Sequence, residues 1–312
     1  MPVWLVTGGS GFLGRHLLAA LRASAPSSVE VVALGRRPPA DWPAEAFLRA
    51  DLDDLPALAR LAADLAPEVV FHAAGLTPPA APHLFYKANT GMTANLLAAL
   101  RACGRSVRVV LAGSAAELGP VPVEDLPVAE DYPCRPADAY GLSKWAASYL
   151  GRTMRPPLEV VTARIFNPIG PGLPPTQALG RFAAKLAEPG PDPLRLVVGD
   201  LDSRRDFLDI RDVAVAMIAL AHRGHAGLVY HVGSGRSRRV GEGLDDLIQR
   251  SGRSIEVIAQ PGVRRGPADS RADIRRITEH TSWAPRIAWE QSLADLWDEA
   301  RSRAMASSRR VT

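Results

Sequence analysis

The clearest candidate for chemistry in this chain is a tyrosine followed four residues later by a lysine, Tyr140 and Lys144. On a helix, this spacing brings the phenol and the ammonium group to one face. A free tyrosine has a pKa of about 10, and a neighbouring cation lowers that pKa because it stabilises the phenolate. The pair therefore predicts a general acid–base, although the same spacing also occurs in ordinary surface helices.

A serine, Ser114, follows the strand-like segment 107–111. Open α/β sheets bind their ligands at the carboxyl ends of their strands, so this hydroxyl could hydrogen-bond a substrate carbonyl. A role as a helix cap is the alternative. Together with Tyr140 and Lys144, Ser114 completes a candidate catalytic set.

A glycine-rich turn stands between strand-like residues 3–6 and a helical pattern over 13–25. Its glycines let the backbone turn tightly and approach a pyrophosphate at the helix N-terminus. The turn therefore predicts a dinucleotide site, with a ligand-free strand–helix turn as the alternative. The residues of the turn that we assign to cofactor binding are Gly8, Gly11, Phe12, Leu13 and Gly14.

The end of the second strand distinguishes between the two nicotinamide cofactors. Enzymes that bind NAD usually carry an acid there for the ribose hydroxyls, whereas this chain has Arg36 and Arg37. Because an arginine can pair with the 2′-phosphate of NADP, NADP(H) is favoured and NAD(H) remains possible. The alternative is that both arginines are solvated loop residues. Further on, Asp51 could accept a hydrogen bond from the adenine amino group or cap a helix.

Strand-like and helical segments alternate through the first half of the chain, which predicts a doubly wound α/β domain with a parallel sheet. The strand-like segments are residues 3–6, 29–34, 69–72, 107–111 and 158–163, and the helical ones are 13–25, 55–66, 89–102 and 140–151. A stretch rich in proline and glycine, 167–175, marks the crossing into a smaller α/β lobe. In that lobe we expect helices at 177–188, 212–223, 242–250 and 291–303, strands at 194–198 and 228–232, and a frayed tail at 305–312. We assign residues 1–166, with about 206–232, to the nucleotide-binding domain, and 167–205 with 233–312 to the substrate-binding lobe.

The amino-acid composition indicates which binding partners and which cellular compartment to expect. The 312 residues are 47% hydrophobic and 22% charged, which is typical of a globular protein. Cys103 and Cys134 lack metal-ligand spacing, so we expect free thiols in a reducing cytoplasm and no metal site. We expect no leader and no membrane span. The net charge of +4 comes from scattered basic residues, which favour a small anionic substrate over a nucleic acid.

These motifs resemble those of the extended short-chain dehydrogenase/reductase family, in its branch of sugar-nucleotide epimerases and dehydratases. Ser114, Tyr140 and Lys144 match the catalytic triad of that family, and the resemblance covers nearly the whole chain. It implies a Rossmann doubly wound parallel sheet with a smaller C-terminal α/β substrate-binding lobe. It also implies a homodimer, because members often pair through a four-helix bundle. The further cofactor-binding residues that it implies are Asp51, Leu52, Ala73, Ala74, Gly75, Asn89, Tyr140, Lys144 and Phe166.

The motifs of the second half are most similar to those of GDP-4-keto-6-deoxymannose reductases and related reductases of nucleotide-linked 4-ketohexoses. They lie at residues 164–172, 198–201, 205–213, 230–235 and 283–285. The resemblance implies substrate binding by Ser114, Asn167, Arg205 and Arg265. Arg264 is nearly as good a match as Arg265, because the spacing to the next aspartate differs from that of the family. Asn167 could instead form a turn, and Arg205 could pair with Asp206 or Asp209.

The implied reaction is the NADPH-dependent reduction of a ketone on a nucleotide-linked 4-keto-6-deoxyhexose. Ser114 would donate a hydrogen bond to the ketone, Tyr140 would deliver the proton, and Lys144 would orient the nicotinamide ribose and lower the pKa of Tyr140. Dehydratases of the family carry Asp-Glu directly after the triad hydroxyl, where this chain has Ala115 and Ala116. The alternatives are an NAD-dependent sugar-nucleotide epimerase, a reductase of a non-sugar ketone, and a silent member that binds NADP(H) as a redox sensor.

Overall fold

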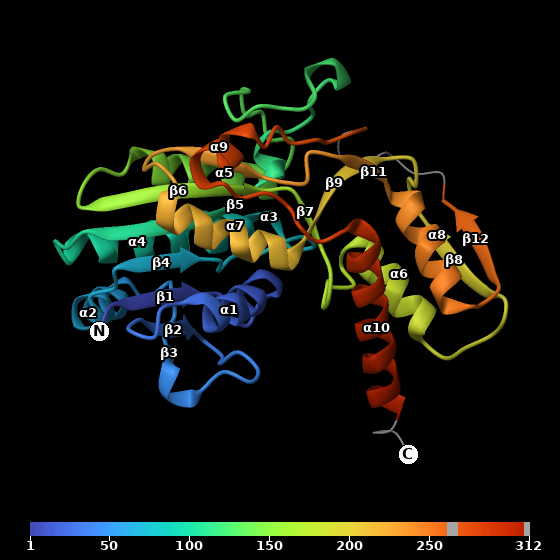
Figure 1. Cartoon of the computed structure of the whole chain (residues 1–312), viewed down its shortest axis with the longest axis horizontal. Helices are drawn as coiled ribbons and strands as arrows, with labels where there is room; N and C mark the ends of the chain where they lie inside the picture. The colour runs from blue at the N-terminus through green and yellow to red at the C-terminus, as the bar shows by residue number, and fades with distance from the viewer. Residues whose placement is uncertain (261–267, 309–312) are drawn as a thin grey trace.

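The computed structural model describes residues 1–260 and 268–308. Its centre is a seven-stranded parallel sheet in the order β10-β6-β5-β4-β1-β2-β3 (Figure 1). Helices cover both faces of this sheet, which explains why the central strands are almost continuously apolar. The strands are β1 (Val3–Thr7), β2 (Glu30–Gly35), β3 (Phe47–Arg49), β4 (Val69–His72), β5 (Val107–Ser114), β6 (Leu158–Ile165) and β10 (Val229–Val232).

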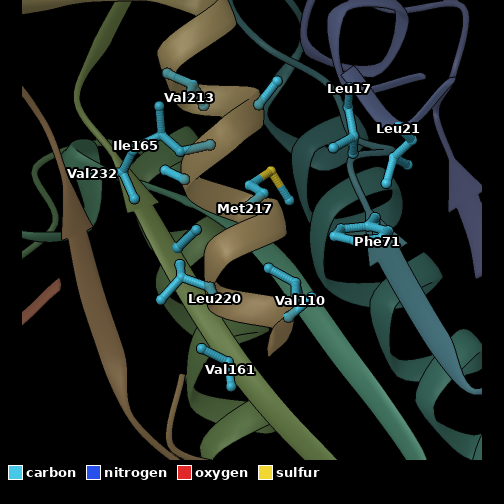
Figure 2. Close-up of a cluster of buried hydrophobic side chains, with 14 of the residues drawn as sticks. Leu17, Leu21, Phe71, Val110, Val161, Ile165, Val213, Met217, Leu220 and Val232 are labelled. Carbon is cyan, nitrogen blue, oxygen red and sulfur yellow. The ribbon is translucent and has the colours of Figure 1, made fainter. Parts of the chain in front are cut away.

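The helices on the two faces build two apolar layers. On one face α1 (Phe12–Ser24) and α7 (Ile210–Arg223) pack together, and on the other lie α2 (Leu55–Leu65), α4 (Met92–Ala102) and α5 (Ala139–Thr153). Figure 2 shows α7 laying Val213, Met217 and Leu220 over the side chains of β5 and β6. This four-then-three spacing forms one apolar stripe of a helix, and it anchors β5, whose last residue is the candidate catalytic Ser114.

The C-terminal part of the chain has a core of its own. It is built by α6 (Ala178–Ala187), α8 (Val240–Ser251) and α10 (Trp289–Ser308) against the parallel pair β8 (Leu194–Val198) and β12 (Ile255–Ala259), at the right of Figure 1. A three-stranded sheet connects this part to the large sheet. It consists of β7 (Asn167–Ile169), β9 (Arg204–Asp209) and β11 (Ser237–Arg239). The helix α9 (Arg275–Thr281) lies apart from this sheet and packs near α7 and β10.

Short helical turns complete the chain. They are the 3-10 turns η1 (Ala44–Ala46), η3 (Ala115–Glu117) and η4 (Val123–Asp125), the helix α3 (Pro82–Phe85), and the π-helical turn η2 (Tyr86–Gly91). Within the described ranges, no helix combines the length and apolar character that crossing a membrane requires.

Several predicted segments differ from the observed ones. The helix predicted over 89–102 is instead the π-helical turn η2 followed by α4, and the wider turn begins before the predicted helix. The tail predicted to fray continues as α10 to Ser308, while 309–312 lie outside the described residues. The strands β7, β9, β11 and β12 were not predicted. The strands β7 and β11 have only three residues each, and β9 begins with three charged residues in a row and has no apolar alternation.

Candidate active site

The glycine turn forms a cradle at the carboxyl end of β1. A Cβ atom added at Gly8, whose φ is +75°, would lie 2.5 Å from the amide nitrogen of Ala74. A Cβ at Gly14 would lie 2.7 Å from the Cα of Gly9. The helix α1 begins at Phe12 after Gly11, and no described side chain caps it, so its first amides are available to an anion. This cradle fits the pyrophosphate of a dinucleotide, and binding by Gly8, Gly11, Phe12, Leu13 and Gly14 stays a prediction.

The buried His72, for which the sequence predicted no role of its own, supports the glycine cradle through two hydrogen bonds. His72 Nδ1 lies 2.7 Å from Thr7 Oγ1, and His72 Nε2 lies 3.0 Å from Thr93 Oγ1. Because Thr93 Oγ1 donates its proton to the carbonyl of Asn89, it must accept from Nε2, which therefore carries the ring proton. Burial, reinforced by the charge of Lys144, lowers the pKa of His72 to about 3. A neutral ring thus joins β1 to α4.

Asn89 links the loop after β4 to the candidate catalytic helix. Its Oδ1 accepts from the amide of Leu76 at 2.8 Å, and its Nδ2 donates to the carbonyl of Leu76 and to Ser143 Oγ, at 3.1 and 2.9 Å. A Cβ at Gly75 would lie 3.9 Å from Lys144 Nζ, so the loop 73–75 passes beside the lysine. Asn89 is 2% exposed and its amide is engaged within the protein. A direct contact of Asn89, Ala73, Ala74 or Gly75 with the cofactor stays a prediction.

The structure brings Ser114, Tyr140 and Lys144 together at the carboxyl end of β5. The phenol of Tyr140 lies within hydrogen-bonding reach of Ser114, and the ammonium group of Lys144 donates to the carbonyl of Ala112. The ring of Phe85 meets that of Tyr140 edge-on, with 5.6 Å between their centroids. A hydroxyl, a phenol and an ammonium group in this order can bind a carbonyl oxygen and protonate it.

Ser114 also caps a helical turn, so the alternative reading of this residue holds as well. Its Oγ accepts from the amide of Ala116 at 3.2 Å, and the carboxylate of Glu117 accepts from the amide of Ser114 at 2.7 Å. A serine hydroxyl offers one donor and two acceptor positions, so capping and the bond to Tyr140 are compatible.

The pKa of Tyr140 is raised in the structure, whereas the sequence predicted that it is lowered. Burial raises the pKa of Tyr140 above its usual value, the hydrogen bond to Ser114 opposes this, and the charges of Glu117 and Asp138 add to it. The prediction that Lys144 lowers this pKa is wrong for this structure, in which the ammonium group is held by the Ala112 carbonyl. Burial lowers the pKa of Lys144 itself, and the charge of Glu117 opposes that shift.

A hollow of about 410 Å³ lies at the ends of β2 and β3, where we expect the adenosine end of the cofactor. Arg36 and Asp51 line it, whereas Arg37 lies outside it. Arg49, which pairs in register with Gly35, lines it too and was missed; its position at the end of a short strand beside Arg36 is the signal that could have found it. The alternative that Asp51 caps α2 is wrong, because the side chain that accepts from Ala57 N is that of Asp54.

Two other predicted cofactor residues are buried. Leu52 is 6% exposed, and its carbonyl accepts from Asn95 Nδ2 at 2.9 Å. Phe166 is 2% exposed and its ring packs edge-on against that of His231. A contact of Phe166 with a dinucleotide would therefore have to come from its backbone.

A larger hollow of about 670 Å³ lies between α6, β8 and β9, and both Asn167 and Arg205 line it. Asn167 belongs to the strand β7, with its Nδ2 donating to the carbonyl of Asp206 at 3.3 Å, so the alternative of a turn-forming asparagine is wrong. Arg181 on α6 also lines this hollow and was missed, since nothing in its local sequence distinguishes it from a solvated arginine. Arg264 and Arg265 lie outside the described residues.

The carboxylates that could have paired with Arg205 are engaged elsewhere. Asp209 binds Arg211, with 2.8 Å between Oδ2 and Nη2. Asp206 accepts from Ser234, Gly235 and Ala272. The Nη1 of Arg205 donates to the carbonyl of Arg204 at 2.8 Å. Among the residues that the structure describes, no group of three or more His, Cys, Asp and Glu side chains could hold a metal ion.

Comparison with known proteins agrees with this architecture. Residues 4–233 match the NAD dependent epimerase/dehydratase family. The chain is 34% identical over 310 residues to GDP-6-deoxy-D-mannose reductase from Pseudomonas aeruginosa, covering 96% of this chain and 97% of that protein. It is 30% identical over 301 residues to dTDP-6-deoxy-L-talose 4-dehydrogenase (NAD(P)(+)) from Kitasatospora kifunensis, covering 94% and 93%. The solved structure of RMD from Pseudomonas aeruginosa complexed with NADPH superimposes with a TM-score of 0.86 at 33% identity, covering 97% and 100%.

The chain belongs to the NAD dependent epimerase/dehydratase family, which is the extended branch of the short-chain dehydrogenases and reductases. The similarity to a nucleotide-sugar reductase and a nucleotide-sugar dehydrogenase spans nearly the whole chain. The predicted family, the Rossmann-type α/β fold and the class of oxidoreductase are therefore confirmed.

Proposed function

We propose that this protein uses NADPH to reduce the ketone of a nucleotide-linked 4-keto-6-deoxyhexose. The observation that carries the proposal is the convergence of Ser114, Tyr140 and Lys144 at the end of β5. The loop 73–75 connects this point to the cradle, because Ala74 contacts Gly8 and Gly75 lies beside Lys144. One edge of the sheet thus offers a dinucleotide cradle and a proton donor together.

The glycine cradle would hold NADPH, which would supply the hydride for the carbonyl carbon. Ser114 donates a hydrogen bond to the carbonyl oxygen as negative charge develops on it, and Tyr140 delivers the proton. The raised pKa of Tyr140 keeps the phenol protonated at neutral pH, which is the form that a reduction consumes. Lys144, half-buried beside the cradle, would bind the nicotinamide ribose.

The charged residues of the two hollows supply the remaining contacts. Arg36, which lines the smaller hollow, would bind the 2′-phosphate of NADP, and this supports NADP(H) over NAD(H). The bound NADPH of the solved relative points the same way, while the name of the talose dehydrogenase allows either cofactor. Arg205 and Asn167, with Arg265 or Arg264, would bind the diphosphate and sugar of the substrate.

The proposal extends to organisation and compartment. Residues 1–166, with about 206–232, would hold the cofactor, and 167–205 with 233–312 the substrate, which the separate C-terminal core supports. A homodimer is supported by the exposed apolar side chains of Leu142 and Tyr149 on α5 and of Leu84 and Tyr86 beside it. A cytoplasmic location is supported by Cys103 and Cys134, which are both free thiols.

The experiment that tests the function follows NADPH absorbance with GDP-, dTDP- and UDP-linked 4-keto-6-deoxyhexoses, each generated in place by its own dehydratase. We expect consumption of NADPH with one of them. Consumption with none of them contradicts the proposal. In that case NAD⁺ released from the denatured protein would indicate an epimerase, and a protein without bound cofactor would direct the search to non-sugar ketones.

A further inference from the structure

A carboxylate that the proposed reaction does not use lies directly behind the catalytic set. Glu117, on η3, has a fully buried side chain. Its Oε1 accepts from the amide of Ser114 at 2.7 Å and from Ser148 Oγ at 2.9 Å. Its Oε2 accepts from Arg164 Nε at 3.0 Å. One carboxylate thus joins the end of β5, the helix α5 and the strand β6.

Arg164 is fixed as firmly as Glu117. Its side chain is 3% exposed, and all three of its nitrogens have partners. Besides Glu117, its Nη1 lies 3.2 Å from His231 Nε2 and its Nη2 lies 3.2 Å from Cys134 Sγ. Since a guanidinium only donates, His231 Nε2 accepts and Nδ1 carries the proton that goes to the carbonyl of Val128. Burial, with the charge of Arg164, lowers the pKa of His231 well below its usual value, which keeps the ring neutral.

Stability alone does not explain the buried Glu117–Arg164 pair. A buried ion pair loses the hydration of both charges, and apolar side chains of similar volume can replace such a pair without loss of stability. Only a carboxylate, however, can accept from Ser114, Ser148 and Arg164 at once. The chain even makes room for it, because a Cβ at Gly113 would lie 2.6 Å from Glu117 Oε1.

We propose that the buried Glu117–Arg164 ion pair positions the catalytic set, with Glu117 fixing Ser114 relative to α5 and Arg164 fixing Glu117. The two are positioning residues, since Glu117 acts through Ser114 and through the helix that carries Tyr140 and Lys144. The inference rests on the proposed ketone reduction, because it assigns a part to the same catalytic set.

The charge of Glu117 also contributes to the raised pKa of Tyr140, after burial. Three groups around Tyr140 act on its pKa besides burial: the hydrogen bond from Ser114 lowers it, and the charges of Glu117 and Asp138 raise it. Lys144 lies one turn along the same helix, and α3 presents the uncharged ring of Phe85. The substitution Glu117→Gln removes one of the two negative charges, so the pKa of Tyr140 falls. Because a reduction needs the protonated phenol, activity is then lost at a lower pH.

The test compares Glu117→Gln with the wild type in three measurements: kcat and KM, the pH profile of kcat, and the tyrosinate absorbance that disappears in Tyr140→Phe. We expect kcat to fall by about 10- to 100-fold with little change in KM, since misplacing a reacting group by about 1 Å can cost a factor of 100. The alkaline limb of kcat and the titration of Tyr140 should both move to lower pH. Glu159→Gln is the matched control, because it breaks the Arg108–Glu159 pair at the opposite end of β5 and β6.

A second variant separates the loss of the Glu117 carboxylate from any misfolding that an unpaired buried cation causes. Glu117→Gln leaves the Arg164 cation unpaired, whereas Glu117→Gln with Arg164→Gln removes both charges and should show the same two shifts. Wild-type kcat and an unmoved Tyr140 titration in either variant overturn the inference. So does a loss of activity that accompanies a lower Tm without any pH shift, because that indicates a structural role alone. If the wild type itself reduces no ketone, the proposed function fails, and the Tyr140 titration still decides the role of Glu117.

Discussion

The ammonium group of Lys144 on α5 donates a hydrogen bond to the backbone carbonyl of Ala112 on β5, two residues before Ser114. Tyr140 lies one turn earlier on the same helix, so this bond sets where the phenol stands relative to the serine. A second bond, from Asn89 on η2 to Ser143, ties the same helix to a turn that also binds Leu76 in the loop after β4. The helix with the proton donor is therefore held to β5 directly and to the cofactor loop through Asn89, and the acid meets that loop in a fixed geometry.

Replacing Tyr140 by phenylalanine should abolish turnover while NADPH still binds. The variant keeps the ring that packs against Phe85 and loses only the phenolic proton. A general acid typically contributes 10²–10⁴-fold, so kcat should fall at least about 100-fold. NADPH binding, measured by fluorescence titration, serves as the control for folding. Near-normal turnover in this variant would contradict the assignment of the acid.

The substitution Gly8→Ala should destroy the cofactor cradle. Its Cβ would collide with the backbone of Ala74, which cannot move without displacing the loop beside Lys144. Gly104→Ala is the matched control, since Gly104 also has a positive φ, +65°, and nothing lies within 4 Å of the added atom. The control should lose about 1–2 kcal/mol of stability from backbone strain alone. Thermal unfolding and NADPH titration should show a larger loss and no binding for Gly8→Ala; equal behaviour of the two variants would refute the collision.

The arginines that line the smaller hollow should make the protein bind NADPH more tightly than NADH. Arg36→Gln and Arg49→Gln each remove a cation that lines it, and a hydrogen bond to a charged group contributes about 1.5–3 kcal/mol, or roughly 10-fold or more in Kd. Affinity for NADPH should fall by that factor while affinity for NADH stays the same. Arg37→Gln, which changes an exposed arginine outside the hollow, should leave both affinities unchanged. Equal losses for the two cofactors would mean that these arginines do not bind the 2′-phosphate.

His72 should make the stability of the protein depend on pH. Its pKa is about 3 in the folded protein and about 6.5 in an unfolded chain. The unfolded state therefore binds a proton as pH falls below about 6.5 and the folded state does not until about 3, so stability is lost across this window. Between pH 7 and pH 5 the loss from this residue is ~2 kcal/mol.

Urea denaturation of the wild type, of His72→Gln and of His83→Gln at these two pH values measures that contribution. His83 is exposed, and its substitution should leave the pH dependence as it is in the wild type. His72→Gln is less stable at pH 7 because the bridge between Thr7 and Thr93 is changed, but it should lose less stability on acidification. The same loss in all three proteins would show that His72 is not the responsible group.

The sequence by itself determined the features that depend on neighbours along the chain. Apolar runs and helical periodicity predicted the strands and helices of the first half, and the four-residue spacing of Tyr140 and Lys144 predicted their placement on one helix. The glycine turn between a strand and a helix predicted the cradle. These predictions succeed because strand burial, helix geometry and tight turns are set by a few consecutive residues.

Only the tertiary structure decided which distant residues meet. Arg164 lies 47 positions from Glu117, and His72 lies 65 positions from Thr7, yet each pair is in hydrogen-bond contact. The apolar neighbours of Arg164 in the sequence indicate that it is buried with a partner but do not say which one. That choice depends on the order of the strands, which places β5 beside β6 and β1 beside β4. The pKa of Tyr140 was decided in the same way, because burial by the whole fold raises it and the lysine one turn away is not among the groups that shift it.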